Sequence, residues 1–287
     1  MQGVRRTLPD LSIRQLEYLV AVSEAPNWAA AASKVGVSAS ALSQGLAELE
    51  RRVGVPLFDR EGRRRVLRPS AHEVLAHARQ VVALTGDLAE WVDRVRTGHD
   101  GTLRVGMIDA AAVGHFPEVL RRFRLEHPEL DFRLRVAPSS QLLDELVLGD
   151  LDLIVCVESA EPRRGITTQP LLTEDLAVFA PGGRPSPDPA EWGPWVLFAV
   201  GSHTRDVIDG VLRELGCATE IVAESNQPEV LRAMVGLGVG WTVLPVVQSN
   251  PDLGVGRVVA SRRLVIANRE GSPFGPAARM LEEQLRA

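Results

Sequence analysis

Residue types that commonly carry chemistry are scarce in this chain of 287 residues. It contains two cysteines, Cys156 and Cys217, which are too few for a disulfide framework and lack the C-x-x-C spacing of metal or redox pairs. The six histidines, at positions 72, 77, 99, 115, 127 and 203, show no paired metal-ligand spacing. We therefore expect no structural disulfides, no metal centre and no cofactor.

Long apolar runs are also absent. The segment Met1–Asp10 lacks the apolar stretch of a signal peptide, and no run reaches the length of a transmembrane helix. These absences predict a cytoplasmic protein without a membrane-spanning segment. Lysine occurs only at Lys34, and this preference for arginine is most simply explained by a GC-rich genome.

Enzyme signatures are missing as well. The sequence contains neither a G-x-S-x-G elbow nor a phosphate-binding P-loop. Ser202 and His203 are a nucleophile and a base in adjacent positions, but neighbouring side chains rarely point at each other, so the pair lacks the geometry of a triad. We expect no catalytic residues and a protein that is not an enzyme.

What the sequence does contain is an uneven distribution of charge. Hydrophobic residues make up 45% and charged residues 24%, as in ordinary globular proteins, and the length suggests more than one domain. Residues 1–68 carry eleven basic against seven acidic residues, a net charge of +4; the remainder carries 21 against 30, a net charge of −9. A basic head on an acidic body is typical of a DNA reader with an attached module that should not touch DNA.

A helix-turn-helix pattern occupies the basic head. Asn27–Lys34 is predicted to be a short helix, Val35–Val37 a tight turn containing glycine, and Ser38–Arg52 a second helix opened by a capping serine. An earlier helix begins at a capping box between Ser12 and Gln15. We expect Trp28 to anchor the core of this domain rather than to stack on DNA. The apolar positions expected to fill this core are Leu16, Leu19, Val20, Trp28, Ala32, Leu42, Leu46, Leu49 and Leu57.

The polar side of the second helix is expected to enter the major groove, because short hydroxyls allow a close approach and glutamine pairs with adenine. Its predicted DNA-binding residues are Ser38, Ala39, Ser40, Ser43 and Gln44. A hairpin tip rich in arginine follows and resembles a wing that clamps phosphates. Its predicted contacts are Arg60, Arg63, Arg64 and Arg65. A charge run that merely faces solvent is the alternative for the tip.

A long helix is predicted from Ser70 to Thr97, because proline is absent and apolar residues recur at steps of three and four. The stripe of candidate dimerisation residues is Val81, Leu84, Leu88, Trp91 and Val95, and a second stripe beside it contains Leu75, Ala78, Val82, Thr85, Ala89 and Val92. Pairing with the same helix of another subunit would cover this face. Packing against the chain's own following domain is the alternative.

Beyond a glycine-containing hinge at 98–101, the pattern changes to alternating strands and helices, which predicts parallel sheets with crossover helices. The strands are expected at 103–108, 132–136, 151–157, 176–180, 195–200, 220–223, 240–244 and 264–267. Four strand-to-helix junctions carry small polar residues, and ligands of α/β sheets bind at such junctions. The candidate effector-binding residues there are Asp109, Ala110, Ser139, Ser140, Gln141, Ser202, His203, Thr204 and Asn226. For each polar residue taken alone, a helix N-cap is the alternative.

The segment from the second helix into the tip resembles the amino-terminal domain of LysR-type bacterial transcriptional regulators. The family pattern S-x-x-A-L-S-x-x-(I/L)-x-x-L-E-x-x-(L/V)-G-V-x-L-F-x-R is matched by Ser38, Ala41, Leu42, Ser43, Leu46, Leu49, Glu50, Val53, Gly54, Val55, Leu57, Phe58 and Arg60. Gly149–Val155 and Val230–Pro245 are similar to two segments of the family's effector domain. The resemblance therefore extends over nearly the whole chain.

The resemblance implies an α/β multidomain protein. It predicts a winged helix-turn-helix domain over 1–69, a linker and dimerisation helix over 70–98, and an effector domain over 99–287 similar to two-lobed periplasmic binding proteins. Lobe I would contain about 101–170 and 263–287, and lobe II about 171–262. The family binds its effector in the cleft between these lobes. Asp109 stands where the family commonly has a hydroxyl residue, and it would repel a carboxylate, so the effector carries a cation or hydroxyl or binds elsewhere.

The function implied is transcriptional regulation through sequence-specific DNA binding that responds to a small-molecule effector. The expected partners are double-stranded promoter DNA, the effector, and further copies of the chain in a dimer or tetramer; contact with RNA polymerase is left open. A regulator of the same fold that responds to thiol oxidation through Cys156 or Cys217 is one alternative. A small-molecule binding protein without a DNA function is the other.

Overall fold

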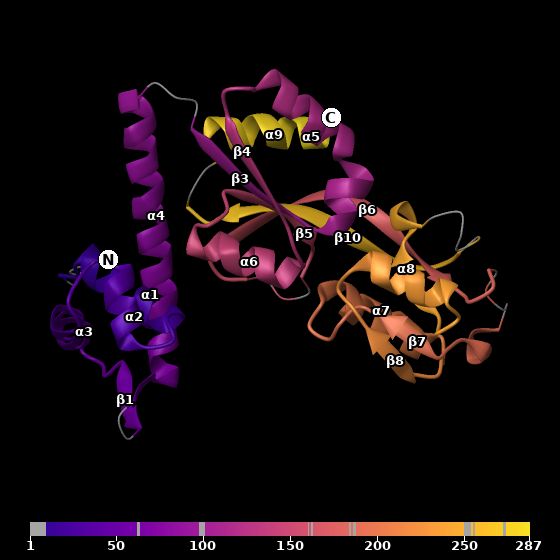
Figure 1. The fold of residues 1–287 in the computed structure, drawn as a ribbon, viewed down its shortest axis with the longest axis horizontal. Helices are drawn as coiled ribbons and strands as arrows, with labels where there is room; N and C mark the ends of the chain where they lie inside the picture. Colours follow the sequence, from indigo (N-terminus) through magenta and orange to yellow (C-terminus); the bar gives the residue numbers. More distant parts are fainter. Residues whose placement is uncertain are drawn as a thin grey trace, which may run out of the picture. The chain divides into compact units, whose positions relative to one another are not determined.

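The computed structural model describes residues 10–61, 64–97, 101–159, 161, 163–183, 185, 188–249, 254, 256–271 and 274–287. The chain divides into two compact units, Met1–Arg96 and Thr97–Ala287. Figure 1 shows the helices and strands of both units.

The first unit is a small helical domain with a two-stranded hairpin and one long helix. Its elements are α1 (Ile13–Glu24), α2 (Trp28–Lys34), α3 (Ala39–Val53), β1 (Phe58–Glu61), β2 (Arg64–Leu67), the 3₁₀ turn η1 (Pro69–Ala71) and α4 (His72–Thr97). The predicted winged helix-turn-helix is confirmed.

The three short helices of this unit begin where the sequence supplies side-chain caps. Ser12 and Gln15 form the capping box of α1. The side chain of Asn27 accepts the backbone N–H of Ala30 at the start of α2, and Ser38 accepts that of Ala41 at the start of α3. These short-range bonds satisfy donors that a helix start would otherwise leave open.

The core of the first unit lies between the three short helices and the start of α4. All the leucines predicted for it are buried, whereas Val20 and Trp28 are partly exposed at its edge. Glu50 fixes the approach to the hairpin, because its carboxylate oxygen Oε1 accepts the backbone N–H groups of Leu57 at 2.7 Å and Phe58 at 3.2 Å. The hairpin is therefore attached to α3 by polar bonds as well as by packing.

The second unit alternates strands and helices over its first part. Its elements are β3 (Thr102–Met107), the π-helical turn η2 (Ala110–His115), α5 (Pro117–Glu126), β4 (Asp131–Val136), α6 (Ser139–Leu148), β5 (Leu153–Val157), β6 (Ile166–Phe179), η3 (Pro189–Glu191), β7 (Trp195–Leu197), α7 (His203–Glu214), β8 (Ile221–Glu224), α8 (Pro228–Gly236), β9 (Thr242–Pro245), η4 (Val246–Gln248), β10 (Arg257–Arg269) and α9 (Pro276–Arg286).

The main sheet of this unit is mixed, so the prediction of parallel sheets holds for only some of its strand pairs. Its strand order is β4-β3-β5-β10-β6-β9. Strand β3 is parallel to β4 and β5, but β10 is antiparallel to both β5 and β6. The long strands β6 and β10 pair antiparallel along nearly their whole length, and the chain between them forms lobe II. Strands β7 and β8 form a separate parallel pair.

Two hydrophobic cores share the long strands β6 and β10. The first core, which defines lobe I, is built from β3, β5, α5, α6, α9 and the end of β10. The second, which defines lobe II, is built from β7, β9, α7, α8 and the end of β6. The change from one core to the other falls between Leu172 and Leu176 on β6 and between Ala260 and Leu264 on β10. The two lobes are thus joined by an antiparallel pair of strands.

Two helical glycines of the first unit make a matched test of this packing. A Cβ atom added at Gly45 on α3 would lie 2.7 Å from ring atoms of the buried Tyr18, whereas one added at Gly86 on α4 would meet nothing within 4 Å. We expect Gly45→Ala to destabilise the unit by about 1–3 kcal/mol through overpacking. Gly86→Ala should stabilise it by about 0.5–1 kcal/mol through helix propensity. Thermal unfolding measures whether each variant is less or more stable than the wild type. Equal changes in unfolding temperature for the two variants would contradict the packing of α3 on α1.

Candidate DNA-binding surface and effector cleft

The polar residues predicted to read DNA lie on the outer side of α3. Ser38, Ala39, Ser40 and Gln44 are exposed and Ser43 is half-buried, while the leucines on the other side of α3 are fully buried. Ser38 has a second role, because its hydroxyl caps the helix at 3.1 Å from the Ala41 nitrogen. The helix thus presents a row of short polar side chains on a rigid, capped start.

The wing is the hairpin of β1 and β2, in which Arg60 pairs with Arg65 and Glu61 with Arg64. Arg63 and the side chains of Arg60 and Arg64 lie outside the described residues. The guanidinium of Arg65 lies over the ring of Trp28, 4.8 Å from its centroid. Trp28 in turn meets Phe58 edge-on at 5.2 Å. Arg65 therefore fastens the wing to α2, a role that the sequence pattern did not indicate.

The predicted dimerisation stripe of α4 remains exposed over its described part. Val81, Leu84 and Leu88 are 37%, 40% and 59% exposed, and the side chains of Trp91 and Val95 lie outside the described residues. The second stripe differs, since its first members, Leu75 and Ala78, are buried in the core of the first unit. Part of the apolar face is thus covered within the chain and part is not.

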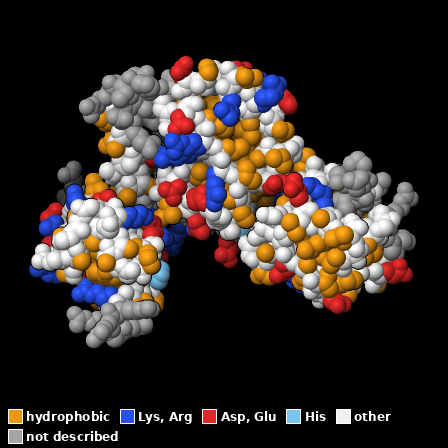
Figure 2. All heavy atoms as spheres, viewed as in Figure 1, with side chains coloured by type: hydrophobic (Ala, Val, Ile, Leu, Met, Phe, Trp, Pro, Cys, Tyr) orange, Lys and Arg blue, Asp and Glu red, His pale blue; other side chains and the backbone are white. Residues whose placement is uncertain are grey.

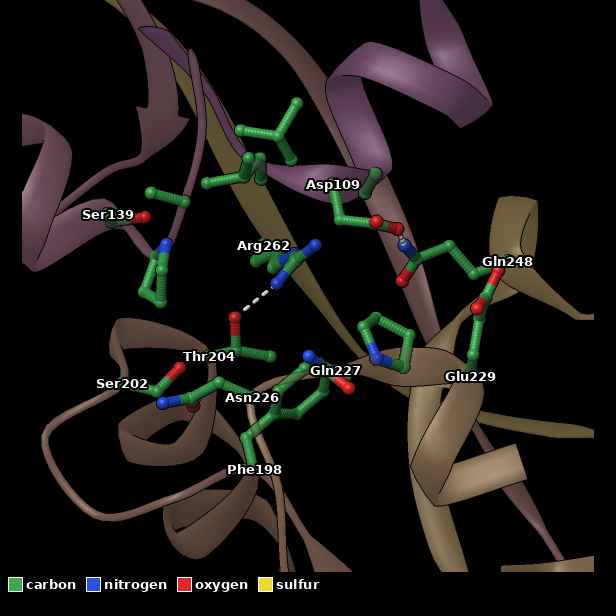
Figure 3. A pocket seen from close by; sticks show the side chains of 16 residues that line it. Asp109, Ser139, Phe198, Ser202, Thr204, Asn226, Gln227, Glu229, Gln248 and Arg262 are labelled. Atoms are coloured by element: carbon green, nitrogen blue, oxygen red, sulfur yellow. Dashed lines mark hydrogen bonds between the residues drawn. The ribbon is translucent and has the colours of Figure 1, made fainter. Parts of the chain in front are cut away.

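A cavity of about 510 Å³ lies between the two lobes of the second unit (Figure 3). It is lined by Ile108, Asp109, Ala110, Val136, Ala137, Pro138, Ser139, Phe198, Ser202, Thr204, Asn226, Gln227, Pro228, Glu229, Gln248 and Arg262. Of the nine candidate effector residues, six therefore line it. Ser140 and Gln141 are exposed outside it, and the ring nitrogen Nδ1 of His203 lies 3.3 Å from the carbonyl oxygen of Val157.

The hydroxyl residues of the cavity differ in how they are bound. Ser139 is buried, and its hydroxyl accepts the backbone N–H of Val157 at 3.1 Å. The Ser202 side chain makes no capping bond to α7, although it holds the N-cap position. The alternative of simple N-caps thus holds for neither residue, because Ser139 joins α6 to β5 and Ser202 leaves its hydroxyl for another partner.

A charged network crosses the floor of the cavity. Arg262 on β10 forms an ion pair with Glu174 on β6, with Nε and Nη2 both 2.6 Å from Oε1. The guanidinium also donates to the hydroxyl of Thr204 (Figure 3), and the other Glu174 oxygen lies 2.8 Å from Nε2 of His115. Burial lowers the pKa of Arg262, and Glu174 opposes this change. Neither Arg262 nor Glu174 was predicted, since nothing around them distinguishes them from other charged strand residues.

Asp109 and Gln248 meet across the cleft from the two lobes. The amide nitrogen of Gln248, in the turn after β9, donates to the carboxylate of Asp109, which directly precedes η2 (Figure 3). Burial raises the pKa of Asp109, partly offset by this hydrogen bond. The contact ties the lobes together at one edge of the cavity.

Both cysteines are buried in separate cores. Cys156, on β5, belongs to lobe I and Cys217 to lobe II. Burial raises the pKa of Cys156 to about 12 and also raises that of Cys217. Because the thiolate is the form that reacts with oxidants, this geometry gives no support to a thiol-responsive regulator.

Lobe II also has an apolar outer surface. Figure 2 shows hydrophobic side chains gathered over the region of β7, β8 and α7. Ile221 and Val222 on β8 are 39% and 45% exposed.

No helix in the described residues is long and apolar enough to span a lipid bilayer.

The two units correspond to two known families of domain. Residues 13–72 match the bacterial regulatory helix-turn-helix protein of the lysR family, and residues 96–287 match the LysR substrate binding domain. The chain is 34% identical to the probable hydrogen peroxide-inducible genes activator of Streptomyces viridosporus over 84% of this chain and 79% of that protein. It is 27% identical to the transcriptional activator IlvY of Salmonella typhimurium over 92% of each chain.

Solved structures show the same fold. Full-length OxyR from Pseudomonas aeruginosa, in a variant form, matches with a TM-score of 0.67 at 24% identity, covering 96% of this chain and 95% of that one. CbnR in complex with its target DNA matches with a TM-score of 0.61 at 22% identity, covering 96% and 99%. A DNA-binding head joined to a two-lobed binding module defines a ligand-responsive DNA-binding protein. The chain belongs to the LysR family of transcriptional regulators.

The two wing arginines should separate phosphate contact from packing. We expect Arg64→Ala to lower the slope of log affinity against log salt by about one unit and to leave thermal stability unchanged. Arg65→Ala should in addition lower stability by about 0.5–1 kcal/mol, because its contact with Trp28 is lost. Anisotropy titrations over a salt series and thermal melts give the two readouts, and identical behaviour of the variants would contradict the assignment.

The exposed stripe of α4 should be an interface between subunits. Leu84→Asp and Leu88→Asp would each bury an unpaired charge there, at a cost on the order of several kcal/mol. Sedimentation velocity should then detect monomers. Leu237→Asp, at a leucine 80% exposed in lobe II, is the matched control and should leave the oligomer intact. Oligomers that survive both α4 changes would move the interface elsewhere.

Proposed function

We propose that this chain is a cytoplasmic, homo-oligomeric regulator that reads promoter DNA with α3 and the wing and adjusts that binding when a small effector enters the cleft. The observation that carries the proposal is the presence, in one chain, of an exposed polar helix face on a helix-turn-helix and of a polar cavity between two lobes. An exposed polar face on a helix-turn-helix serves no purpose in an enzyme or in a binding protein without a DNA function.

The DNA-reading part rests on α3. Gln44 offers both a donor and an acceptor, the pattern that pairs with adenine in the major groove. Ser38, Ser40 and Ser43 are short enough to let the helix approach bases and phosphates closely. The wing arginines would add contacts with the backbone that fix register without reading sequence.

The oligomer rests on two apolar surfaces. The exposed stripe of α4 has the spacing of a helix pair, and a dimer places two recognition helices on successive turns of DNA. The exposed valine and isoleucine of β8 offer a second surface, which supports association beyond a dimer into a tetramer. RNA polymerase is a further proposed partner, for promoters at which the regulator activates transcription.

The switch rests on the position of the cleft. Because the lobes are joined by two strands and touch through Asp109 and Gln248, a ligand between them favours one arrangement of the lobes over another. The effector can shift DNA binding only by its difference in affinity for these arrangements, so effector and operator must affect each other's binding by the same factor. We propose no catalysis, because one ring nitrogen of His203, Nδ1, lies against the carbonyl oxygen of Val157 and adjacent side chains rarely form a nucleophile and base.

Recognition by Gln44 can be tested on the DNA upstream of the protein's own gene. We expect the wild type to bind one site there more tightly than random DNA of the same length. Gln44→Ala should weaken specific binding by about 1–3 kcal/mol and relax the preference at one base pair, with non-specific binding unchanged. Gln141→Ala, at an exposed glutamine of the second unit, is the control. Full affinity and unchanged base preference in Gln44→Ala would refute the assignment.

A further inference from the structure

We propose that the cleft recognises a small zwitterionic amine, of the size and charge of an amino acid, whose ammonium group binds Asp109. The inference rests on the proposed function of the cleft as the effector site and deepens it by naming the chemical class of the ligand. It follows from which charges of the lining are already neutralised and which are not.

Three ionisable side chains line the cavity: Asp109, Glu229 and Arg262. The charge of Arg262 is already neutralised, because Glu174 accepts two of its N–H groups and Thr204 a third. Both Arg262 and Glu174 have side chains less than 5% exposed, so this pair cannot turn toward a ligand without breaking a buried contact. The charge left to meet a ligand is therefore that of two carboxylates.

Asp109 is the stronger of the two candidates. Glu229 is 86% exposed and lies 3.8 Å from Arg232, so solvent screens it. Asp109 is half-buried, and within the described residues it accepts the amide of Gln248 but pairs with no arginine or lysine. Burial acts on Asp109 more strongly than the opposing charges of Glu229 and Arg232, and a ligand ammonium in contact with it would offset the cost of this desolvation.

The opposite side of the cavity suits a carboxylate. Ser139, Ser202 and Asn226 face the space between the lobes (Figure 3). The hydroxyl of Ser202 makes no helix-capping bond, and Ser139, which accepts the N–H of Val157, still has its own hydrogen to donate. The first turns of α6 and α7 begin beside these residues, and their backbone N–H groups add to the attraction for an anion.

The remaining lining is apolar and would hold the body of the ligand. Its main members are Ile108, Val136, Pro138, Phe198 and Pro228. A cavity of about 510 Å³ is within the range of small-molecule sites and accommodates an amino acid with a few waters. Since Asp109 belongs to lobe I and its partner Gln248 to lobe II, an ammonium bound there contacts both lobes and favours the arrangement in which they meet.

The test is a thermal-shift and calorimetry series on the full-length wild type. The probes are the twenty common amino acids at 10 mM and, for each one that stabilises the protein, the corresponding deaminated acid and decarboxylated amine. We expect at least one amino acid to raise the unfolding temperature, and its deaminated acid to bind at least tenfold more weakly. Asp109→Asn should weaken binding of the amino acid at least tenfold, whereas Glu118→Gln, at an exposed glutamate of α5, should not.

The outcomes separate this inference from the proposed function. Without ligand, Asp109→Asn should unfold at the same or a higher temperature than the wild type, because it removes a partly desolvated carboxylate; a lost fold is thereby excluded as the cause of weak binding. Deaminated acids that bind as well as the amino acid, in both proteins, would overturn the ammonium site while leaving the cleft as the effector site. Ligands whose affinity is unchanged in Ser202→Ala and Asp109→Asn alike would overturn both. Absence of any shift by an amino acid also overturns the inference.

Discussion

The buried ion pair between Glu174 and Arg262 lies at the junction of the two lobes, and the geometry of the cleft depends on it. The two residues face each other in register on β6 and β10, at the place where one core gives way to the other. Removing two charges from water is expensive and is compensated only by good geometry and further hydrogen bonds. Here His115 from lobe I and Thr204 from lobe II supply those bonds. Any change in the angle between the lobes must therefore keep or rearrange this network.

The parts of the fold that sequence predicts well are those specified by short-range contacts. The side chains of Asn27 and Ser38 accept N–H groups three residues away, the side chain of Gln15 accepts the N–H of Ser12, and the buried leucines of α3 recur at helical spacing. Such signals can be recognised without knowing what lies across the core. The glycine at position 45 has a physical reason that only the folded structure shows, because the ring of Tyr18 occupies the space that a side chain would need.

The cleft was only partly predictable from the sequence, because long-range contacts organise it. The strand-to-helix junctions indicated six of its lining residues, five of them polar, but the bonds that organise it join distant positions. Glu174 and Arg262 are 88 residues apart, and Asp109 and Gln248 are 139 residues apart. The long strands β6 and β10 were predicted at a fraction of their length, because Thr167–Pro170 is exposed and lacks the apolar run of a core strand. The π-helical turn η2 has no sequence signature, although such turns are frequent at functional sites.

The constraint that holds the lobes together also bears on what the cleft can bind. An arginine lining a cavity would ordinarily attract an anionic ligand. In this protein Glu174 on the neighbouring strand balances the charge of Arg262. The arginine therefore takes part in the contact that joins the two lobes. Inside the cleft, Asp109 is an acidic group whose hydrogen-bond partner Gln248 is neutral, and the charges of Glu229 and Arg232 act on it in opposite directions. The ion pair that stabilises the junction of the lobes thus leaves Asp109 as an acidic group facing the cleft, so the fold and the proposed ligand preference depend on the same pair of strands.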